Sequence, residues 1–215
     1  MTRRLAALAL TAVSLLLPAA SFAQEMAPDA LVRKSIDEVL VLIKADKDLQ
    51  NGNPKKLHAL VEEKILPHFD FTRMTRLAVG RSWSQASDAQ KQALTREFQS
   101  LLVRTYSTSI SQYRNQTIDV KPAKIAAGDK DTVVRTVVNQ PGGQPIPIDY
   151  SMERADKGWK VYDVVVDGVS LVTTYRGSFN EQIQKSGVDG LVKTLADRNN
   201  SSEAPKAPVK VDLKK

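Results

Sequence analysis

The chain has 215 residues, a formal net charge of +7 and no cysteine. Disulfides and zinc sites built from thiolates are therefore excluded, and a packed hydrophobic core must stabilise the fold on its own. Much of the positive charge lies in the two terminal segments, and the remaining basic residues are scattered among acidic ones, which argues against nucleic-acid binding.

The first 23 residues have the pattern of a secretory signal peptide. Two arginines precede an apolar run at residues 5–17, and small residues at positions 21 and 23 form a cleavage site. The run is shorter than the roughly 20 residues that a membrane-spanning helix needs. We therefore predict a signal peptide over residues 1–23 and export of the mature chain from the cytoplasm.

A broad apolar face marks the first predicted helix. The helix is expected to run from Asp29, as its N-cap, to about Leu49. Its apolar side chains recur at helical spacing and are Leu31, Val32, Ile36, Val39, Leu40 and Ile43. So wide an apolar face indicates that this helix packs against the rest of the domain.

Two shorter helices are predicted next. The first of them is expected to start at Pro54, because proline suits the first position of a helix, and to end at Pro67. Asp70 is expected to cap a short helix that closes at Gly80.

The longest predicted helix opens with a capping box, Ser87 to Gln90. Its apolar side chains again recur at helical spacing and are Leu94, Phe98, Leu101, Leu102, Tyr106, Ile110 and Tyr113. The helix is therefore amphipathic, and one side of it must be covered.

The hydrophobic period changes from 3.6 to 2 near Thr117, which marks the start of a sheet. Four extended runs follow, at residues 117–126, 132–140, 146–153 and 158–166. Short turns rich in Gly, Asp and Pro separate them, so an antiparallel meander is predicted. Pro147 in the third run predicts an edge strand or a bulge there. One face of that run is apolar and carries Ile146, Ile148, Tyr150 and Met152.

The fourth run leads directly into a further amphipathic helix. The strand is apolar and β-branched, with Val164 and Val166 near its end. In the helix Leu171, Tyr175 and Phe179 recur every fourth residue and share one side. A last helix over residues 188–197 follows Gly187. Residues 199–215, rich in Lys and Pro, are expected to be a disordered tail.

These elements predict one α+β domain over residues 24–198. Its helices would cover one face of a curved antiparallel sheet of about four to five strands. Such a half-shell can enclose an apolar pocket, because the sheet face and several helix stripes present apolar side chains. The same stripes are also compatible with ordinary core, where Leu, Val and aromatic residues occur far more often than in ligand sites.

The sequence contains no obvious catalytic or metal-binding motif. Its two histidines, His58 and His68, lack metal-ligand spacing, and no nucleotide-binding or nucleophile motif occurs. One alternative remains an enzyme with an apolar, cone-shaped active site in which Asp163 or Asp149 is the general base. A second alternative is an adaptor protein whose apolar stripes are only core.

Two long blocks resemble the MlaC family of periplasmic phospholipid-binding proteins, also called toluene-tolerance auxiliary proteins. The first block is FDFTRMTRLAVGRSWSQAS, residues 69–87, and the second is PIPIDYSMERADKGWKVYDVVVDGVSLVTTYRGSFNEQI, residues 145–183. The resemblance implies helices on a curved antiparallel sheet with a deep apolar pocket. It also implies a periplasmic carrier that is not an enzyme, that has bound phospholipid as cargo and that needs no cofactor.

The resemblance further implies the partners of such a carrier. Phospholipid would move between an outer-membrane lipoprotein complex and an inner-membrane ABC transporter with a ring-forming lipid-binding subunit, which maintains outer-membrane lipid asymmetry. Arg81 and Arg176 are expected at the pocket mouth or at a partner contact. Fifteen apolar residues are expected to contact the lipid, namely Leu77, Val79, Trp83, Phe98, Leu102, Tyr106, Ile146, Ile148, Tyr150, Met152, Val164, Val166, Leu171, Tyr175 and Phe179.

Overall fold

The computed structural model describes residues 25–113, 115–126 and 128–203. The predicted signal peptide lies outside the described residues, as do residues 204–215 of the predicted tail. The helices are α1 Pro28–Ala45, α2 Lys47–Gln50, α3 Pro54–Lys64, α4 Phe71–Val79, α5 Asp88–Ser111 and α6 Leu171–Asn200, with 3-10 turns η1 Leu66–His68 and η2 Gly80–Gln85. The strands are β1 Thr117–Val120, β2 Asp131–Asn139, β3 Ile146–Ala155, β4 Gly158–Val166 and β5 Val169–Ser170.

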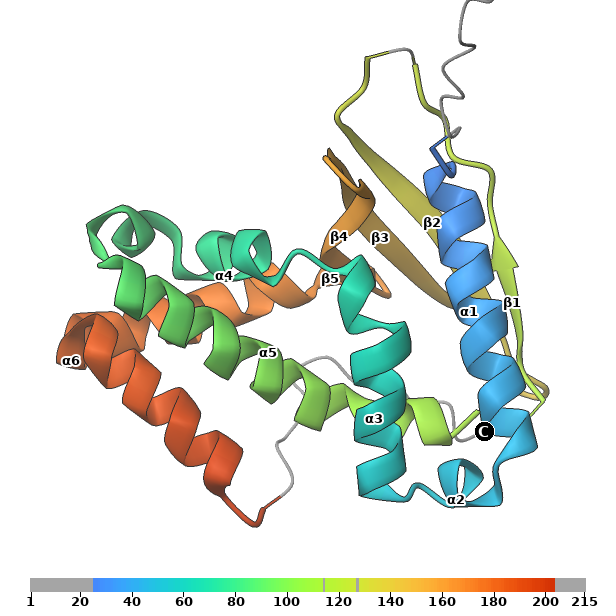
Figure 1. Ribbon diagram of the computed structural model, residues 1–215, viewed down its shortest axis with the longest axis horizontal. Helices are drawn as coiled ribbons and strands as arrows, with labels where there is room; N and C mark the ends of the chain where they lie inside the picture. The colour runs from blue at the N-terminus through green and yellow to red at the C-terminus, as the bar shows by residue number, and fades with distance from the viewer. Residues whose placement is uncertain (1–24, 114, 127, 204–215) are drawn as a thin grey trace, which may run out of the picture.

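The helices form two groups on the sheet (Figure 1). Helix α1 runs along the sheet. Helices α4, α5 and α6 pack together beside the sheet and are called the helical group below, and α3 lies between α1 and this group. The sheet has five strands in the order β1-β2-β3-β4-β5, and every neighbouring pair is antiparallel. The predicted α+β class is therefore confirmed.

Side-chain caps fix three helix starts where the sequence predicted them. The hydroxyl of Ser87 accepts a hydrogen bond from the amide of Gln90 at 3.2 Å, and the Gln90 side chain accepts one from the Ser87 amide at 2.9 Å. The carboxylate of Asp70 caps α4 by accepting from the Arg73 amide at 2.8 Å. Asn53 caps α3 in the same way. Each cap satisfies amides that have no partner within the helix.

The prediction for the first helix is wrong at both ends of the helix. It starts at Pro28, so Asp29 lies in the first turn and Ala27 precedes the helix. Proline is already set for the first helical position, which explains the earlier start. The helix also breaks at Asp46, which has extended backbone angles and a carboxylate that accepts from the Asp48 amide at 2.8 Å.

Two strand predictions differ from the structure. The first strand ends at Val120, because Pro122 follows closely and has no amide hydrogen to continue the ladder. The third run is a central strand and not an edge, since β3 pairs with both β2 and β4. Its irregularity lies between Ser151 and Met152 and not at Pro147.

That irregularity is a β-bulge that changes the facing of β4. Tyr150 pairs with Val164, whereas Met152 pairs with Val161, so β4 carries one more residue than β3 over this stretch. An extra residue reverses the alternation of side chains. Val161 and Val164 therefore lie on the same face of the sheet although their numbers differ by three.

The end of β4 leads into α6 through a tight turn. Asp167 and Gly168 have φ values of 49° and 77°, the positive values that a two-residue hairpin turn requires, and β5 pairs back with β4. Helix α6 is kinked at Gly187, where φ is 72°, and the two helical segments predicted around that glycine are confirmed.

Helix α6 continues to Asn200, past the predicted start of the tail at residue 199. The guanidinium of Arg104 on α5 donates hydrogen bonds to the carbonyls of Arg198 at 2.7 Å, Ser201 at 2.8 Å and Glu203 at 3.2 Å. The described part of the tail is thus tied to α5.

The buried apolar side chains form separate clusters. The helical cluster joins α4, α5 and α6 and includes Phe98, Tyr175 and Phe179. The sheet cluster joins α1 to the strands through Val32, Val134, Met152, Trp159 and Val161, among others. The α3 cluster joins α1, α2 and α3. In the part of the chain that the structure describes, no helix is both long enough and apolar enough to cross a bilayer.

Candidate functional site

Two adjoining cavities lie between the core clusters. The α1 cavity has a volume of about 220 Å³ and separates α1 from the sheet. The α5 cavity has a volume of about 280 Å³ and lies among α3, α4, α5 and the sheet. Ile65, Phe69, Ile110 and Tyr150 line both cavities, so these four side chains stand between them.

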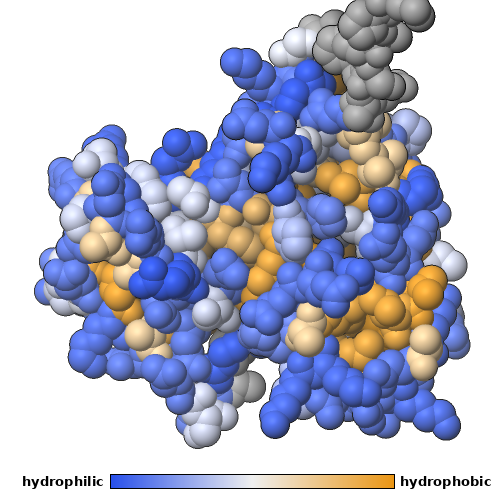
Figure 2. All heavy atoms as spheres, viewed as in Figure 1, coloured by the Kyte–Doolittle hydropathy of each residue, from blue (hydrophilic) through white to orange (hydrophobic). Residues whose placement is uncertain are grey.

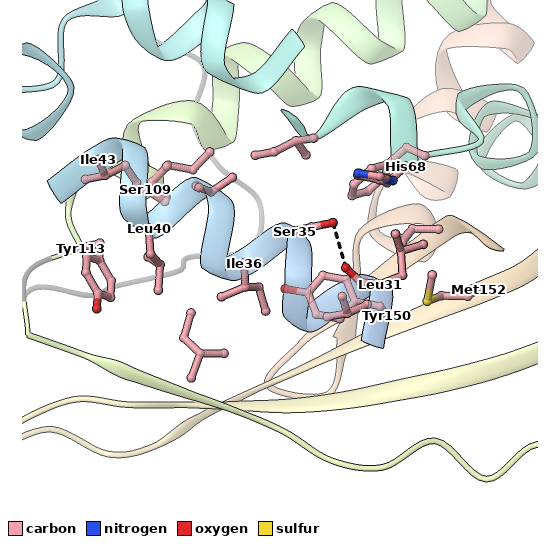
Figure 3. A pocket seen from close by; sticks show the side chains of 17 residues that line it. Leu31, Ser35, Ile36, Leu40, Ile43, His68, Ser109, Tyr113, Tyr150 and Met152 are labelled. Atoms are coloured by element: carbon pink, nitrogen blue, oxygen red, sulfur yellow. Dashed lines mark hydrogen bonds between the residues drawn. The ribbon is translucent and has the colours of Figure 1, made fainter. Parts of the chain in front are cut away.

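Helix α1 forms one wall of the α1 cavity, and Figure 3 shows Ile36 and Leu40 on that helix and Tyr150 close to the strands. The opposite wall comes from Ile118, Met152 and Val161, and the end of α5 closes one side. The few polar groups here are neutral or already bonded. For example, the hydroxyl of Ser35 donates to the carbonyl of Leu31 at 2.9 Å.

The α5 cavity is equally apolar. Its walls come from α3, α4 and α5 on one side and from β3, β4 and the start of α6 on the other. Its lining includes Leu102, Tyr106, Ile148, Val164, Val166 and Leu171. Figure 2 shows apolar side chains open to the surface in hollows on both sides of the position that α3 takes in Figure 1. The cavities therefore reach the surface.

Neither cavity presents a charged side chain. Among the described residues that line them there is no Asp, Glu, Lys or Arg. Burial raises the pKa of Tyr150, so this phenol stays neutral, although a hydrogen bond with Thr136 opposes the shift. Burial also lowers the pKa of His68, helped by the nearby charge of Lys160, from an ordinary value of 6.5. Both groups are thus neutral near pH 7.

Eight of the fifteen residues predicted to contact lipid line a cavity. They are Leu102, Tyr106, Ile148, Tyr150, Met152, Val164, Val166 and Leu171. Ile146 is partly buried in a small cluster with Val166 and Leu171. Leu77 and Trp83 line a separate surface groove on the helical group.

The remaining four predicted residues lie in the helical cluster and on neither cavity wall. They are Val79, Phe98, Tyr175 and Phe179, and all four are buried. The ring of Phe98 lies edge-on to both Tyr175 and Phe179, with centroids 5.0 Å and 5.1 Å apart. These aromatic rings pack against one another and fill the interior of the helical group, which explains why they line neither cavity.

The sequence prediction missed the contribution of α1 and of the segment after α3. Leu31, Ile36, Leu40 and other residues of α1 make up the largest share of the α1 cavity lining. The signal was present, because this helix has an apolar face wider than one packing partner requires. Phe69, which lies on the border of both cavities, is part of the first block that resembles the MlaC family.

Asp163 is bonded within the fold and lines neither cavity. One oxygen of its carboxylate accepts from the amides of Val164 at 2.9 Å and Val172 at 3.1 Å, and the other accepts from the hydroxyl of Ser170 at 2.6 Å. Ser170 itself caps α6 by accepting from the Thr173 amide at 3.0 Å. A carboxylate that bonds to free amides at a helix N-terminus stabilises that terminus. Asp163 therefore holds α6 to β4.

We expect Asp163→Ala to lower the free energy of unfolding by about 1–2 kcal/mol, because the α6 amide and the Ser170 hydroxyl lose their acceptor. Urea unfolding followed by circular dichroism measures the change. Asp163→Asn, which keeps one carbonyl oxygen, is the matched control and should lose less. Unchanged stability in Asp163→Ala would contradict this structural role.

The part of the chain that the structure describes holds no cluster of three or more metal-ligating side chains. The adjoining cavities offer apolar surface lined by no Asp, Glu, Lys or Arg, and His68 is the single histidine among the described residues that line them.

Residues 33–197 match the family model described as MlaC protein. The toluene tolerance protein ttg2D of Pseudomonas putida is 28% identical over 169 residues, which cover 78% of each chain. The intermembrane phospholipid transport system binding protein MlaC of Haemophilus influenzae is 24% identical over 174 residues, 80% of this chain and 81% of that one. A phospholipid-binding protein of Ralstonia solanacearum, solved in complex with a phospholipid, is 46% identical, with a TM-score of 0.74 over 80% of this chain and 96% of that chain.

Proposed function

The chain belongs to the MlaC family, and from this membership we propose that it is a periplasmic phospholipid carrier between the outer and inner membranes. Two of the similar proteins are named for phospholipid transport or phospholipid binding. The predicted signal peptide agrees with this location. The proposed partners are those that the family implies, an outer-membrane lipoprotein complex and an inner-membrane ABC transporter with a ring-forming subunit.

The observation that carries the proposal is the pair of apolar cavities that reach the surface. Two acyl chains together contain about 30 CH₂ groups, and exposing them to water costs more than about 20 kcal/mol at roughly 0.8 kcal/mol for each group. A carrier must therefore replace the bilayer interior with apolar protein surface. Walls without charged side chains meet that requirement.

The division of the space fits a lipid with two chains. The border formed by Ile65, Phe69, Ile110 and Tyr150 would separate two acyl chains that share one glycerol. We assign one chain to the α1 cavity and the other to the α5 cavity. The charged headgroup would stay in water, because burying it without partners is costly.

The enzyme alternative has little support from the geometry. Asp163 uses its carboxylate to bond Ser170 and two amides, away from both cavities. Asp149 is 3.9 Å from the guanidinium of Arg135 on the sheet and also lines neither cavity. A general base must lie within hydrogen-bond reach of its substrate. No catalytic role is therefore proposed.

Native mass spectrometry of the mature protein, purified from the periplasm without detergent, tests the proposal. We expect the folded protein to carry an added mass equal to one diacyl phospholipid, released when the protein is denatured. The bacterial phospholipid extract, measured in parallel, identifies that mass. A folded protein that carries no lipid, even after incubation with phospholipid vesicles, would refute the carrier function.

A further inference from the structure

A groove lined by three arginines lies on the helical group. It has a volume of about 870 Å³ and is formed by the end of α4, by η2 and by α6. We call it the arginine groove, and its lining residues are Arg76, Leu77, Gly80, Arg81, Ser82, Trp83, Ser84, Arg176, Asn180, Ile183 and Gln184. None of them lines either cavity, so the groove is a separate feature.

Local structure fixes the shape of the groove. Gly80 ends α4 with a φ of 67° and turns the chain into η2, beside α6. A side chain would be strained at that backbone angle, so glycine is needed there. The Arg176 Nε atom donates a hydrogen bond to the carbonyl of Leu77 at 3.0 Å, which joins α6 to the last turn of α4. Both walls are therefore held in place before any partner arrives.

The positive charge of the arginine groove is not compensated within it. No lining residue is acidic, and the ion pairs of the described residues do not include Arg76, Arg81 or Arg176. Glu181, on the next position after Asn180, pairs with Lys185 at 2.6 Å. Arginines bind carboxylates through two parallel hydrogen bonds. The groove thus offers a site for negatively charged groups.

The floor of the groove is apolar. Leu77, Trp83 and Ile183 are partly buried and pack against the helical cluster, while the three arginines are exposed around them. Apolar floor and basic rim together suit a chain that alternates acidic and apolar side chains. A flat bilayer surface can contact the exposed rim but cannot reach into a concave floor. A protein segment therefore fits this shape better than a membrane.

We propose that the arginine groove docks an acidic segment with apolar side chains from a protein partner. The inference rests on the proposed function, because a carrier must meet the complexes that give and receive its lipid. Since the groove shares no residue with the cavities, a partner can dock there while the lipid stays bound. Docking and lipid exchange are then separate steps.

The test uses the mature protein with the paired substitution Arg76→Glu and Arg81→Glu. Both side chains are exposed, so the fold should be preserved. Biolayer interferometry measures affinity for the purified outer-membrane lipoprotein complex and for the purified ring-forming subunit of the same bacterium. We expect the affinity for at least one of them to fall about tenfold or more. Lys55→Glu with Lys124→Glu, two exposed lysines that do not line the groove, changes the net charge equally and should have less than a twofold effect.

Two further measurements separate the outcomes. Sedimentation with phosphatidylglycerol vesicles tests whether the arginine groove binds a membrane surface instead. A variant that loses vesicle binding but keeps both protein affinities would overturn the proposal. Equal affinities of the groove variant and the control variant for both partners would also overturn it. Native mass spectrometry of the variant should show an unchanged lipid content. Failure of the carrier function appears instead as absence of lipid in the unaltered protein.

Discussion

Val164→Glu should leave a folded protein that retains less than about a tenth of the phospholipid bound by the unaltered chain. Val164 lies on β4 and lines the α5 cavity. A carboxylate there would face apolar walls, and burying it beside an acyl chain costs several kcal/mol. The protein avoids this cost by admitting water and releasing the chain. Each 1.4 kcal/mol lost from lipid binding lowers the affinity tenfold.

The matched control is Val133→Glu on β2. Val133 is 37% exposed, and its neighbour Val134 is the residue that pairs with Tyr150, so Val133 points away from the cavities. The same substitution there should leave the lipid content unchanged. Phospholipid extracted from purified protein and quantified as phosphate per polypeptide measures both variants. Normal lipid content in Val164→Glu would remove the α5 cavity from the proposed site.

Phe98→Ala is expected to lower the free energy of unfolding by about 3–5 kcal/mol. The side chain is fully buried in the helical cluster, between the rings of Tyr175 and Phe179. Truncation leaves a cavity and removes both edge-to-face contacts. For a domain of this size the loss corresponds to a fall in Tm of roughly 6–20 °C. The lipid content of the molecules that remain folded should not change.

Phe98→Leu, which keeps most of the volume, is the control and should cost much less stability. Differential scanning calorimetry and lipid quantification on the same samples give both results. A variant with normal Tm but little lipid would place Phe98 on the lipid-contacting wall, as the sequence suggested, and would contradict its role as core.

The sequence predicted the elements well where their signals are local. The capping box at Ser87, the cap at Asp70 and the helix start at Pro54 each depend on side chains within three residues of the helix start. The antiparallel order followed from short turns between extended runs. The predicted boundaries were wrong where two signals compete. At Asp46, the apolar stripe continues along the chain, but the carboxylate caps a new helix.

The facing of Val161 could not be predicted, because it depends on the bulge between Val161 and Val164. Strict alternation groups Asp163 with Val161 and Val165, and Val164 with Val166. In the structure the irregularity beside Tyr162 puts Val161 and Val164 on one face of the sheet. Their partners on β3 are Met152 and Tyr150, respectively. A bulge of one residue leaves no clear mark in an apolar strand, so only the pairing with β3 reveals it.

The same limit applies to the helices. The stripe of Leu171, Tyr175 and Phe179 has the spacing of one helix face, and spacing alone cannot distinguish core from cavity wall. In the structure, cavity-lining residues and core residues lie at different positions along α6. Leu171, at the start of α6, lines the α5 cavity, whereas Tyr175 and Phe179, one and two turns later, pack against Phe98.

The separation of the core into clusters links cargo to folding. Where many domains have one continuous interior, this chain has two apolar cavities between its clusters. A ligand that binds only the folded state raises stability by mass action. On the proposed function, the phospholipid is therefore the missing part of the interior, and the emptied carrier is the less stable form. Release of cargo at a membrane would therefore lower the stability of the carrier, and binding of a new lipid would restore it.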